Sequence, residues 1–180
     1  MSKKRELLNK LDVSITIERL CNQLIEHYDF FNNTVIIGVQ PRGVLLSKRI
    51  INRLIDRKLQ IQTGNIDISF YRDDLRRRNN PIVPQEMEMN LTIEGKKVIL
   101  IDDVLYTGRS IRAALDALMS FGRPSKVELL TLIDRRFSRH LPIEPNYVGK
   151  RIDALESERV VVEWQEMHGM DRVLIVNSDL

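Results

Sequence analysis

The sequence predicts an α/β fold in which a mainly parallel sheet carries helices on both faces, with a small C-terminal cap, or hood. Short, almost wholly apolar segments alternate along the chain with segments whose apolar residues recur at helical spacing. This alternation is typical of parallel sheets, because a parallel connection needs a crossover that is usually a helix. Polar residues follow several apolar segments, at the strand ends where such sheets bind ligands.

The predicted strands are short and apolar, as expected of strands covered on both faces, and they span residues 34–39, 66–70, 97–102 and 127–134. The predicted helices are amphipathic and span residues 15–30, 43–56 and 109–118. We expect Ser14 to be the N-cap of the first helix, because its hydroxyl can accept a hydrogen bond from a free N–H group of the first turn. Gly122 and Pro124 are expected to stop the third helix.

Two parts of the chain are less regular. Residues 71–92 are rich in Arg, Asp, Asn and Pro and predict a long polar loop. Residues 135–180 hold short apolar segments near Tyr147–Val148, Val160–Trp164 and Val173–Val176. We assign these segments to the edge of the sheet and to a hood over about residues 135–170, so that residues 1–180 form a single domain.

Composition excludes several classes of protein. The 180 residues are 43% hydrophobic and 29% charged, which suits a globular core and excludes a disordered chain. No apolar run is long enough to span a membrane, and the N-terminus lacks the apolar stretch of a secretory signal. The single cysteine, Cys21, excludes an internal disulfide and a cysteine-based zinc cage, so we expect a cytoplasmic protein. Within residues 1–60, Lys and Arg outnumber Asp and Glu by 11 to 6, a bias that suits phosphate groups.

The segment from Val98 to Ser110, VILIDDVLYTGRS, carries the clearest chemical signal. An apolar strand ends in two adjacent carboxylates, Asp102 and Asp103, and TGRS then opens a helix. Free N–H groups of a first helical turn favour an anion, and Gly108 allows close approach of the backbone. The loop is thus a candidate phosphate cradle, and the carboxylates suit the vicinal hydroxyls of a sugar or a hydroxyl-bound Mg²⁺. The nucleotide motifs G-x-x-x-x-G-K-[ST] and G-x-G-x-x-G are absent.

This segment resembles the phosphoribosyl pyrophosphate (PRPP) signature of the type I phosphoribosyltransferases. Other segments resemble one branch of that family, the pyrimidine-operon regulators that double as uracil phosphoribosyltransferases. These segments are VQPRG at 39–43, DISFYRDDL at 67–75, GRPSKVELLTLIDR at 122–135 and LPIEPNYVGK at 141–150. The resemblance covers about residues 15–176 and implies the type I phosphoribosyltransferase fold.

The resemblance implies which residues would bind PRPP. The 5-phosphate and ribose would lie against the residues of the signature, namely Asp102, Asp103, Val104, Leu105, Tyr106, Thr107, Gly108, Arg109 and Ser110. The pyrophosphate would lie against the loop of Pro41, Arg42 and Gly43, in which the Gln40–Pro41 bond is the candidate for a cis peptide. Mg²⁺ would be bound through PRPP and its pyrophosphate, and no metal site formed by the protein alone is expected.

The resemblance also implies catalytic and base-binding residues. The catalytic residues would be Asp102, Asp103 and Arg72. The segment that begins at Tyr71 would be the flexible catalytic loop, in which Arg72 and the Arg76–Arg78 run close over the pyrophosphate. The pyrimidine would be bound by Asp134, Arg135 and the main chain near Val160.

The implied activity is the formation of UMP and pyrophosphate from uracil and PRPP, by a homodimer or a higher homo-oligomer. Two alternatives remain open: an RNA-binding attenuator of pyrimidine genes with little catalysis, or a phosphoribosyltransferase for another nucleobase. Arg136 stands where the family has a glycine, and Glu18, Glu26 and Asp29 reduce the basic character of the first helix. These departures weigh against an RNA partner, which needs an extended basic face. No membrane partner is expected.

Overall fold

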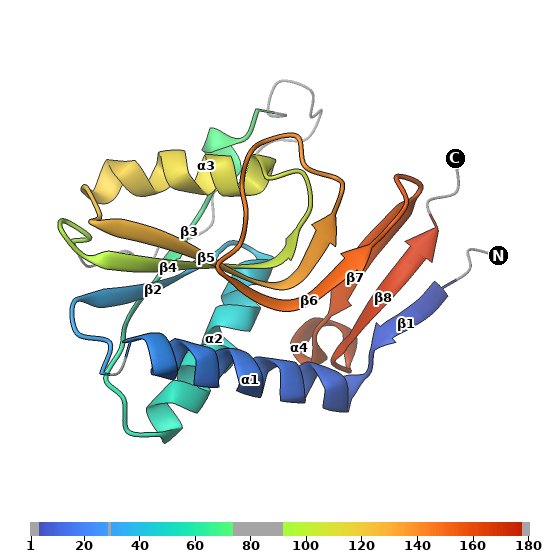
Figure 1. Cartoon of the computed structure of the whole chain (residues 1–180), viewed down its shortest axis with the longest axis horizontal. Helices are drawn as coiled ribbons and strands as arrows, with labels where there is room; N and C mark the ends of the chain where they lie inside the picture. Colours follow the sequence, from blue (N-terminus) through green and yellow to red (C-terminus); the bar gives the residue numbers. More distant parts are fainter. Residues whose placement is uncertain (1–3, 29, 74–91, 178–180) are drawn as a thin grey trace.

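Five parallel strands form the central sheet of the computed structural model, which describes residues 4–28, 30–73 and 92–177 (Figure 1). The strands lie in the spatial order β3-β2-β4-β5-β6. Their bounds are Thr34–Val39 for β2, Gln62–Ile66 for β3, Lys97–Leu105 for β4, Lys126–Arg136 for β5 and Tyr147–Asp153 for β6. The predicted parallel sheet is confirmed.

Helices cover both faces of this sheet, as predicted (Figure 1). α1 (Lys10–Tyr28) and α2 (Arg42–Asp56) lie on one face, and α3 (Arg109–Leu118) lies on the other. Ile36 of β2 packs into the core with α1 and α2, whereas the next residue, Ile37, packs into the core with α3. Because helices cover both faces of the inner strands, β2 is buried along its whole length, and β4 and β5 are buried over most of theirs. None of the helices in the described ranges is long and apolar enough to cross a membrane.

A second sheet, antiparallel and three-stranded, forms the hood in the order β1-β8-β7. β7 (Glu158–Glu163) and β8 (Arg172–Asn177) come from the predicted C-terminal cap, and the short α4 (Gln165–His168) lies between them. β1 (Lys4–Leu8) completes the sheet, although its mostly exposed side chains gave no apolar pattern from which to predict a strand. Trp164 is 1% exposed and packs into the same core as α1 and α2, which anchors the hood to the main sheet.

The first helix begins at Lys10, earlier than predicted, because Asn9 caps it and Ser14 does not. The Asp12 N–H donates to Asn9 Oδ1 (2.9 Å), and the Asn9 N–H donates to Asp12 Oδ2 (3.1 Å). This reciprocal arrangement satisfies backbone donors at the helix start. The Ser14 hydroxyl instead accepts a hydrogen bond from Arg53 of α2.

The strand predicted at 66–70 is also displaced, since β3 ends at Ile66. Asp67 accepts a hydrogen bond from the Ser69 N–H (2.8 Å), and Ser69–Tyr71 form a 3₁₀ turn. An aspartate that bonds the backbone two residues further on begins a turn, which ends the extended strand. Most of the predicted loop 71–92, including Asp74 and the Arg76–Arg78 run, lies outside the described residues.

Candidate active site

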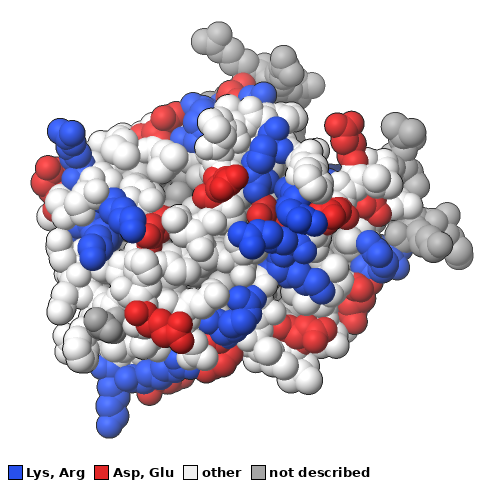
Figure 2. All heavy atoms as spheres, in the orientation of Figure 1, with Lys and Arg blue, Asp and Glu red and all other residues white. Residues whose placement is uncertain are grey.

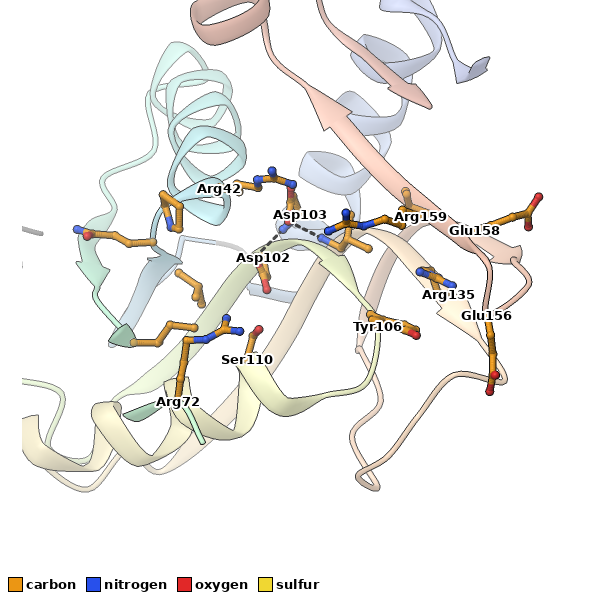
Figure 3. A pocket seen from close by; sticks show the side chains of 16 residues that line it. Arg42, Arg72, Asp102, Asp103, Tyr106, Ser110, Arg135, Glu156, Glu158 and Arg159 are labelled. Carbon is orange, nitrogen blue, oxygen red and sulfur yellow. Dashed lines mark hydrogen bonds between the residues drawn. The ribbon is translucent and has the colours of Figure 1, made fainter. Parts of the chain in front are cut away.

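Loops that follow the central strands surround a cavity of about 770 Å³ (Figure 3). In the parallel register Val39 lies beside Ile66, and Gly38 lies beside Ile101, so the residues that follow reach the same edge of the sheet. The hood supplies another wall through β7. The charged side chains that line the cavity are Arg42, Arg72, Asp102, Asp103, Arg135, Glu156, Glu158 and Arg159.

Asp102 and Asp103 are buried near the end of β4, with exposed fractions of 8% and 5%. Asp102 Oδ1 accepts a hydrogen bond from the Asp103 N–H (2.9 Å), and Asp103 Oδ1 accepts one from the Val104 N–H (2.8 Å), as Figure 3 shows. Asp103 Oδ2 is buried and has no hydrogen-bond partner among the described residues. An unpaired buried carboxylate oxygen is unfavourable until a ligand hydroxyl or a cation meets it.

The environment of the two carboxyl groups disfavours two full negative charges. Burial raises the pKa of Asp102 well above its usual value, and the neighbouring Asp103 adds to that rise. Burial also raises the pKa of Asp103, although the positive charge of Arg42 opposes the rise. The pair is therefore suited to receive a positive charge or hydrogen-bond donors from a ligand.

A smaller cavity of about 200 Å³ lies along the loop between β4 and α3. The residues implied to bind the phosphate line this cavity, namely Val104, Leu105, Tyr106, Thr107, Gly108, Arg109 and Ser110. Gly108 caps α3 with a φ of +89°, a left-handed conformation that favours glycine. Arg72 and Asp73 also line it, and Asp73 forms an ion pair with Arg109. The cavity thus lies at a helix N-terminus, which favours an anion.

The Gln40–Pro41 bond, which the sequence offered only as a candidate for a cis peptide, is cis. Pro41 and Arg42 line the main cavity, whereas Gly43 is buried at the start of α2. A Cβ at Gly43 would lie 2.3 Å from the Ile101 carbonyl oxygen. The missing side chain therefore lets the start of α2 rest against β4, which brings the Arg42 charge near Asp103.

The residues implied to bind the base do not all reach one cavity. Arg135 and Val160 line the main cavity, but Asp134 does not. Asp134 lines a separate cavity of about 270 Å³, where it forms ion pairs with Arg139 and, at 3.5 Å, with Arg151. Successive residues of a strand point to opposite faces, so Asp134 and Arg135 face apart.

Several residues of the site were not predicted from the sequence. Glu156, Glu158 and Arg159 line the cavity from the hood, where sequence reasoning had singled out Val160 alone. Their position depends on how the hood folds over the sheet, which no local motif encodes.

Arg135 connects the loop after β4 with the hood. Its guanidinium carbon lies 4.0 Å from the centre of the Tyr106 ring, a cation–π contact, and its Nη2 donates to the Leu155 carbonyl (3.1 Å). Burial lowers the pKa of Arg135, and its Nε is buried without a hydrogen-bond partner among the described residues. A polar ligand atom could satisfy that donor.

The residues present suit Mg²⁺ only together with oxygen atoms of a ligand. Within the described ranges, no three His, Cys, Asp or Glu side chains are grouped so that they could hold a metal ion. Asp102 and Asp103 supply carboxylate oxygens, the donors that Mg²⁺ prefers, and Asp103 Oδ2 is unpaired. A Mg²⁺ ion here would need further oxygens, such as ribose hydroxyls or pyrophosphate oxygens.

Comparisons with solved structures match the fold. The structure of a hypoxanthine phosphoribosyltransferase from Staphylococcus aureus has a TM-score of 0.70 and 23% identity, over 94% of this chain and 90% of that one. The corresponding enzyme of Trypanosoma cruzi has a TM-score of 0.73 and 16% identity, over 97% of both chains. The fold is therefore that of the phosphoribosyltransferases.

Sequence comparisons identify the family. The phosphoribosyl transferase domain model matches residues 4–167. Bifunctional protein PyrR of Bacillus cereus strain AH820 is 40% identical over 182 residues, which cover 99% of this chain and 100% of that protein. The same protein of Microcystis aeruginosa is 41% identical over 172 residues, which cover 95% and 96%. The chain therefore belongs to the phosphoribosyltransferase family, with bifunctional PyrR proteins as relatives over nearly its whole length.

Proposed function

We propose that the protein is a uracil phosphoribosyltransferase that forms UMP and pyrophosphate from uracil and PRPP. One observation carries this proposal: the Asp102–Asp103 pair, the N-terminus of α3 and the Arg42 loop meet around adjoining cavities. PRPP presents the matching groups, which are two ribose hydroxyls, a 5-phosphate and a pyrophosphate. The resemblance of the chain to pyrimidine-operon regulators selects uracil as the base.

In this proposal each part of PRPP has its own partners. Asp102 and Asp103 accept hydrogen bonds from the ribose hydroxyls, and the loop 107–110 binds the 5-phosphate through N–H and hydroxyl groups. Arg42 and Arg72 pair with the pyrophosphate, for which a guanidinium is well suited. Arg135 and the main chain of Val160 face the base.

The reaction exchanges one bond at C1 of the ribose for another. The bond from C1 to the pyrophosphate oxygen breaks, pyrophosphate leaves with the electron pair, and the new bond joins C1 to N1 of uracil. Asp102 and Asp103 stabilise the positive charge that develops on the ring, while the arginines stabilise the leaving group. Mg²⁺, when bound, would neutralise part of the pyrophosphate charge. The N1 proton needs an acceptor, and Asp103 is the candidate because burial raises its pKa.

An assay with single nucleobases tests this function. The protein is incubated with PRPP, Mg²⁺ and either uracil, cytosine, adenine, guanine or hypoxanthine, and nucleotides are separated by chromatography. We expect UMP from uracil and no product from the others. A different nucleotide would overturn the choice of base, and no nucleotide with any base would overturn the proposed enzyme.

A second function, control of pyrimidine genes through RNA, has one observation in its favour. Lys and Arg side chains gather over the ends of β5 and β6, with carboxylates beside them (Figure 2). Some of these charges are already paired, since Arg136 binds Asp153. Titration of pyrimidine-operon leader RNA at increasing salt tests this role. Specific binding that weakens with salt would support it, and equal binding of an unrelated RNA would contradict it.

We further propose that residues 1–180 work as one domain, in a homo-oligomer of the reducing cytoplasm. One buried cluster joins Trp164 of the hood to α1, α2 and the main sheet. Leu11 and Ile15 are 66% and 58% exposed on α1 and would suit a subunit contact. Burial raises the pKa of the Cys21 thiol to about 11, which keeps it in the unreactive protonated form. Light scattering at several protein concentrations measures the oligomeric state.

A further inference from the structure

The segment after β5, residues 137–143, contacts the loop between β4 and α3, and it lines neither the main cavity nor the smaller one. Arg139 lies at its centre, and the guanidinium of this one residue donates hydrogen bonds to five acceptors. Nη1 donates to the carbonyl oxygens of Tyr106 (2.6 Å), Arg135 (3.0 Å) and Leu105 (3.4 Å), Nε donates to that of Ile143 (2.9 Å), and Nη2 donates to the Asp134 carboxylate. Two of these acceptors, Leu105 and Tyr106, are the last residue of β4 and the first residue of the loop to α3.

The main chain of the same segment adds two further hydrogen bonds to the loop. The N–H groups of His140 and Leu141 both donate to the Thr107 carbonyl, at 3.0 and 3.2 Å. The segment also packs against Gly108, where an added Cβ would lie 3.3 Å from the Ile143 side chain. The loop is therefore bound along its length to one neighbouring segment.

These contacts determine which way the loop directs its N–H groups. The carbonyl oxygens of Leu105, Tyr106 and Thr107 all accept hydrogen bonds from the 139–141 segment. The carbonyl and the following N–H of a trans peptide point in opposite directions. The N–H groups of the next residues, 106 to 108, consequently point away from that segment. A row of successive N–H groups on one side of a loop forms an anion-binding concavity.

We propose that Arg139 is a positioning residue, which holds the peptide planes of residues 105–107 in the orientation that binds the substrate phosphate. This inference rests on the proposed function. Arginine suits the task because its planar guanidinium offers five donors in a fixed arrangement, which a lysine ammonium cannot reproduce. Asp134 is 4% exposed and binds Arg139 Nη2, so it orients the guanidinium and does not contact the base.

Removal of the guanidinium should weaken binding of the phosphate and leave the pyrophosphate subsite intact. In Arg139→Gln, the Leu105 and Tyr106 carbonyls lose the donor that fixes them. We expect the dissociation constant for ribose 5-phosphate, measured by calorimetry, to rise about tenfold or more. The dissociation constant for pyrophosphate with Mg²⁺ should stay within about twofold, because none of the five acceptors of Arg139 belongs to the loop of Pro41, Arg42 and Gly43.

Arg136→Gln is the matched control. Arg136 lies three residues away, is about half exposed and binds Asp153 through Nε (2.7 Å) and Nη2 (2.8 Å). The substitution removes the same charge from the last residue of β5, whose side chain binds Asp153 and not the loop between β4 and α3. It should leave both dissociation constants unchanged. Millimolar methylguanidinium should restore ribose 5-phosphate binding to Arg139→Ala and have no effect on Arg136→Ala.

The outcomes separate this inference from the proposed function. If the unmodified protein binds neither ribose 5-phosphate nor pyrophosphate, the proposed function fails. If it binds both and Arg139→Gln binds both equally well, only the positioning role is overturned, and an equal loss of both ligands would also overturn it. If Arg139→Gln does not fold, Arg139→Lys tests the inference instead. Lysine keeps the positive charge but lacks the planar guanidinium with its five donors. Unchanged ribose 5-phosphate binding by Arg139→Lys would contradict the inference.

Discussion

The buried carboxyl pair makes the stability of the folded chain depend on pH. Burial raises the pKa of Asp102, so the folded state keeps a proton at pH values where the unfolded chain, with a pKa of about 3.9, has released it. The folded state then binds more protons than the unfolded state, and the free energy of unfolding falls as the pH rises through that range. Ionisation of the carboxyl pair by itself is thus unfavourable for the fold, and a ligand that supplies positive charge relieves this cost.

Asp102→Asn should therefore stabilise the protein at pH 8 while it weakens PRPP binding. The amide carries no charge, so the melting temperature should exceed that of the unmodified chain by about 2–4 °C. The advantage should shrink as the pH is lowered towards the unfolded pKa of about 3.9, because Asp102 then keeps its proton in both the folded and the unfolded state. Thermal unfolding across this pH range, without ligands, measures the difference. A constant difference would contradict the assigned pKa shift.

Asp103→Asn should remove most of the activity and leave the fold intact. Its unpaired Oδ2 is the atom that we expect to meet the ribose or its metal ion, and an amide nitrogen cannot accept there. UMP formation should fall by about 10²-fold or more. Asp116→Asn serves as control, because Asp116 is exposed on the surface of α3, where it forms an ion pair with Arg112. Near-normal turnover of Asp103→Asn would refute the role of this carboxylate.

Contacts between elements place the charged residues of the site, and Gly43 is the clearest case. An added Cβ would lie 2.3 Å from the Ile101 carbonyl oxygen and 3.0 Å from Asp102 Cα, so α2 would have to move away from β4. Gly43→Ala should destabilise the fold by about 1–3 kcal/mol and raise the KM for PRPP, because Arg42 moves with the helix. At Gly169 an added Cβ would meet no atom of the described residues within 4 Å. Gly169→Ala should therefore lower the free energy of unfolding by only about 1 kcal/mol, because alanine disfavours the φ of +80° at this position. Denaturant titration compares the two.

A buried glutamate joins three elements at the other end of the sheet. Glu128 of β5 accepts hydrogen bonds from Tyr28 of α1 and from Tyr147 of β6 (2.9 Å), and Lys126 pairs with it. Burial would raise the pKa of Glu128, but the hydrogen bonds from Lys126, Tyr28 and Tyr147 outweigh it and lower that pKa. Its stabilising effect is therefore present above the unfolded pKa of about 4.3 and is lost as the pH falls through the lowered folded value.

Glu128→Gln should destabilise the fold by about 1–3 kcal/mol at pH 7, since the charged acceptor of several donors disappears. The loss should vanish in acid, where the glutamate of the unmodified chain is also neutral. Melting curves at pH 7 and below pH 4 provide the comparison. Tyr147→Phe removes one donor and should have a smaller effect. A loss of equal size at both pH values would show that packing, and not charge, dominates.

Local patterns predicted the elements whose ends depend on their own residues. The strand 34–39 has the predicted bounds because its apolar run defines it. The helix 109–118 also has the predicted bounds, because Gly108 directly precedes its first residue. The start of α1 could not be predicted in this way. Asn9 and Ser14 can both cap a helix, and the choice depends on Asp12 and on Arg53, a residue of another helix. A local sequence pattern does not show which distant residue will bind a candidate capping side chain.

At the scale of the whole molecule, the parts of the site that lie in one continuous segment were predicted, and the parts that depend on contacts between distant segments were not. Asp102–Ser110 form one continuous segment, so a single motif predicted residues that line both cavities. Arg159 lines the cavity only because the hood folds over it. Arg139 lies in the connection between β5 and β6 and binds the loop between β4 and α3, more than thirty residues earlier in the chain. The resemblance implied that both Asp134 and Arg135 bind the base, yet Asp134 lines a separate cavity, because successive residues of a strand face opposite sides.

The hood should be the least stable part of the molecule. β4 has neighbours on both sides and is almost wholly buried, whereas β1 and β7 are edge strands of a small sheet and β1 is mostly exposed. Amide hydrogens of β4 should exchange with solvent slowest, and those of β1 and β7 much faster. Hydrogen–deuterium exchange followed by mass spectrometry measures these rates. Equal protection of both sheets would contradict this expectation.

The pairing of β1 with β8 also has a consequence for how the chain is made. Lys4 lies opposite Val176, so β1 leaves the ribosome long before its partner strand exists. All five strands of the main sheet, and the Asp102–Ser110 loop with them, are synthesised in between. The main sheet and this loop can therefore fold while the rest of the chain is still being synthesised. The hood sheet is complete only when β8 emerges, so a chain truncated ahead of Arg172 would keep the loop that lines the smaller cavity and lose the partner strand of β7, which lines the main cavity.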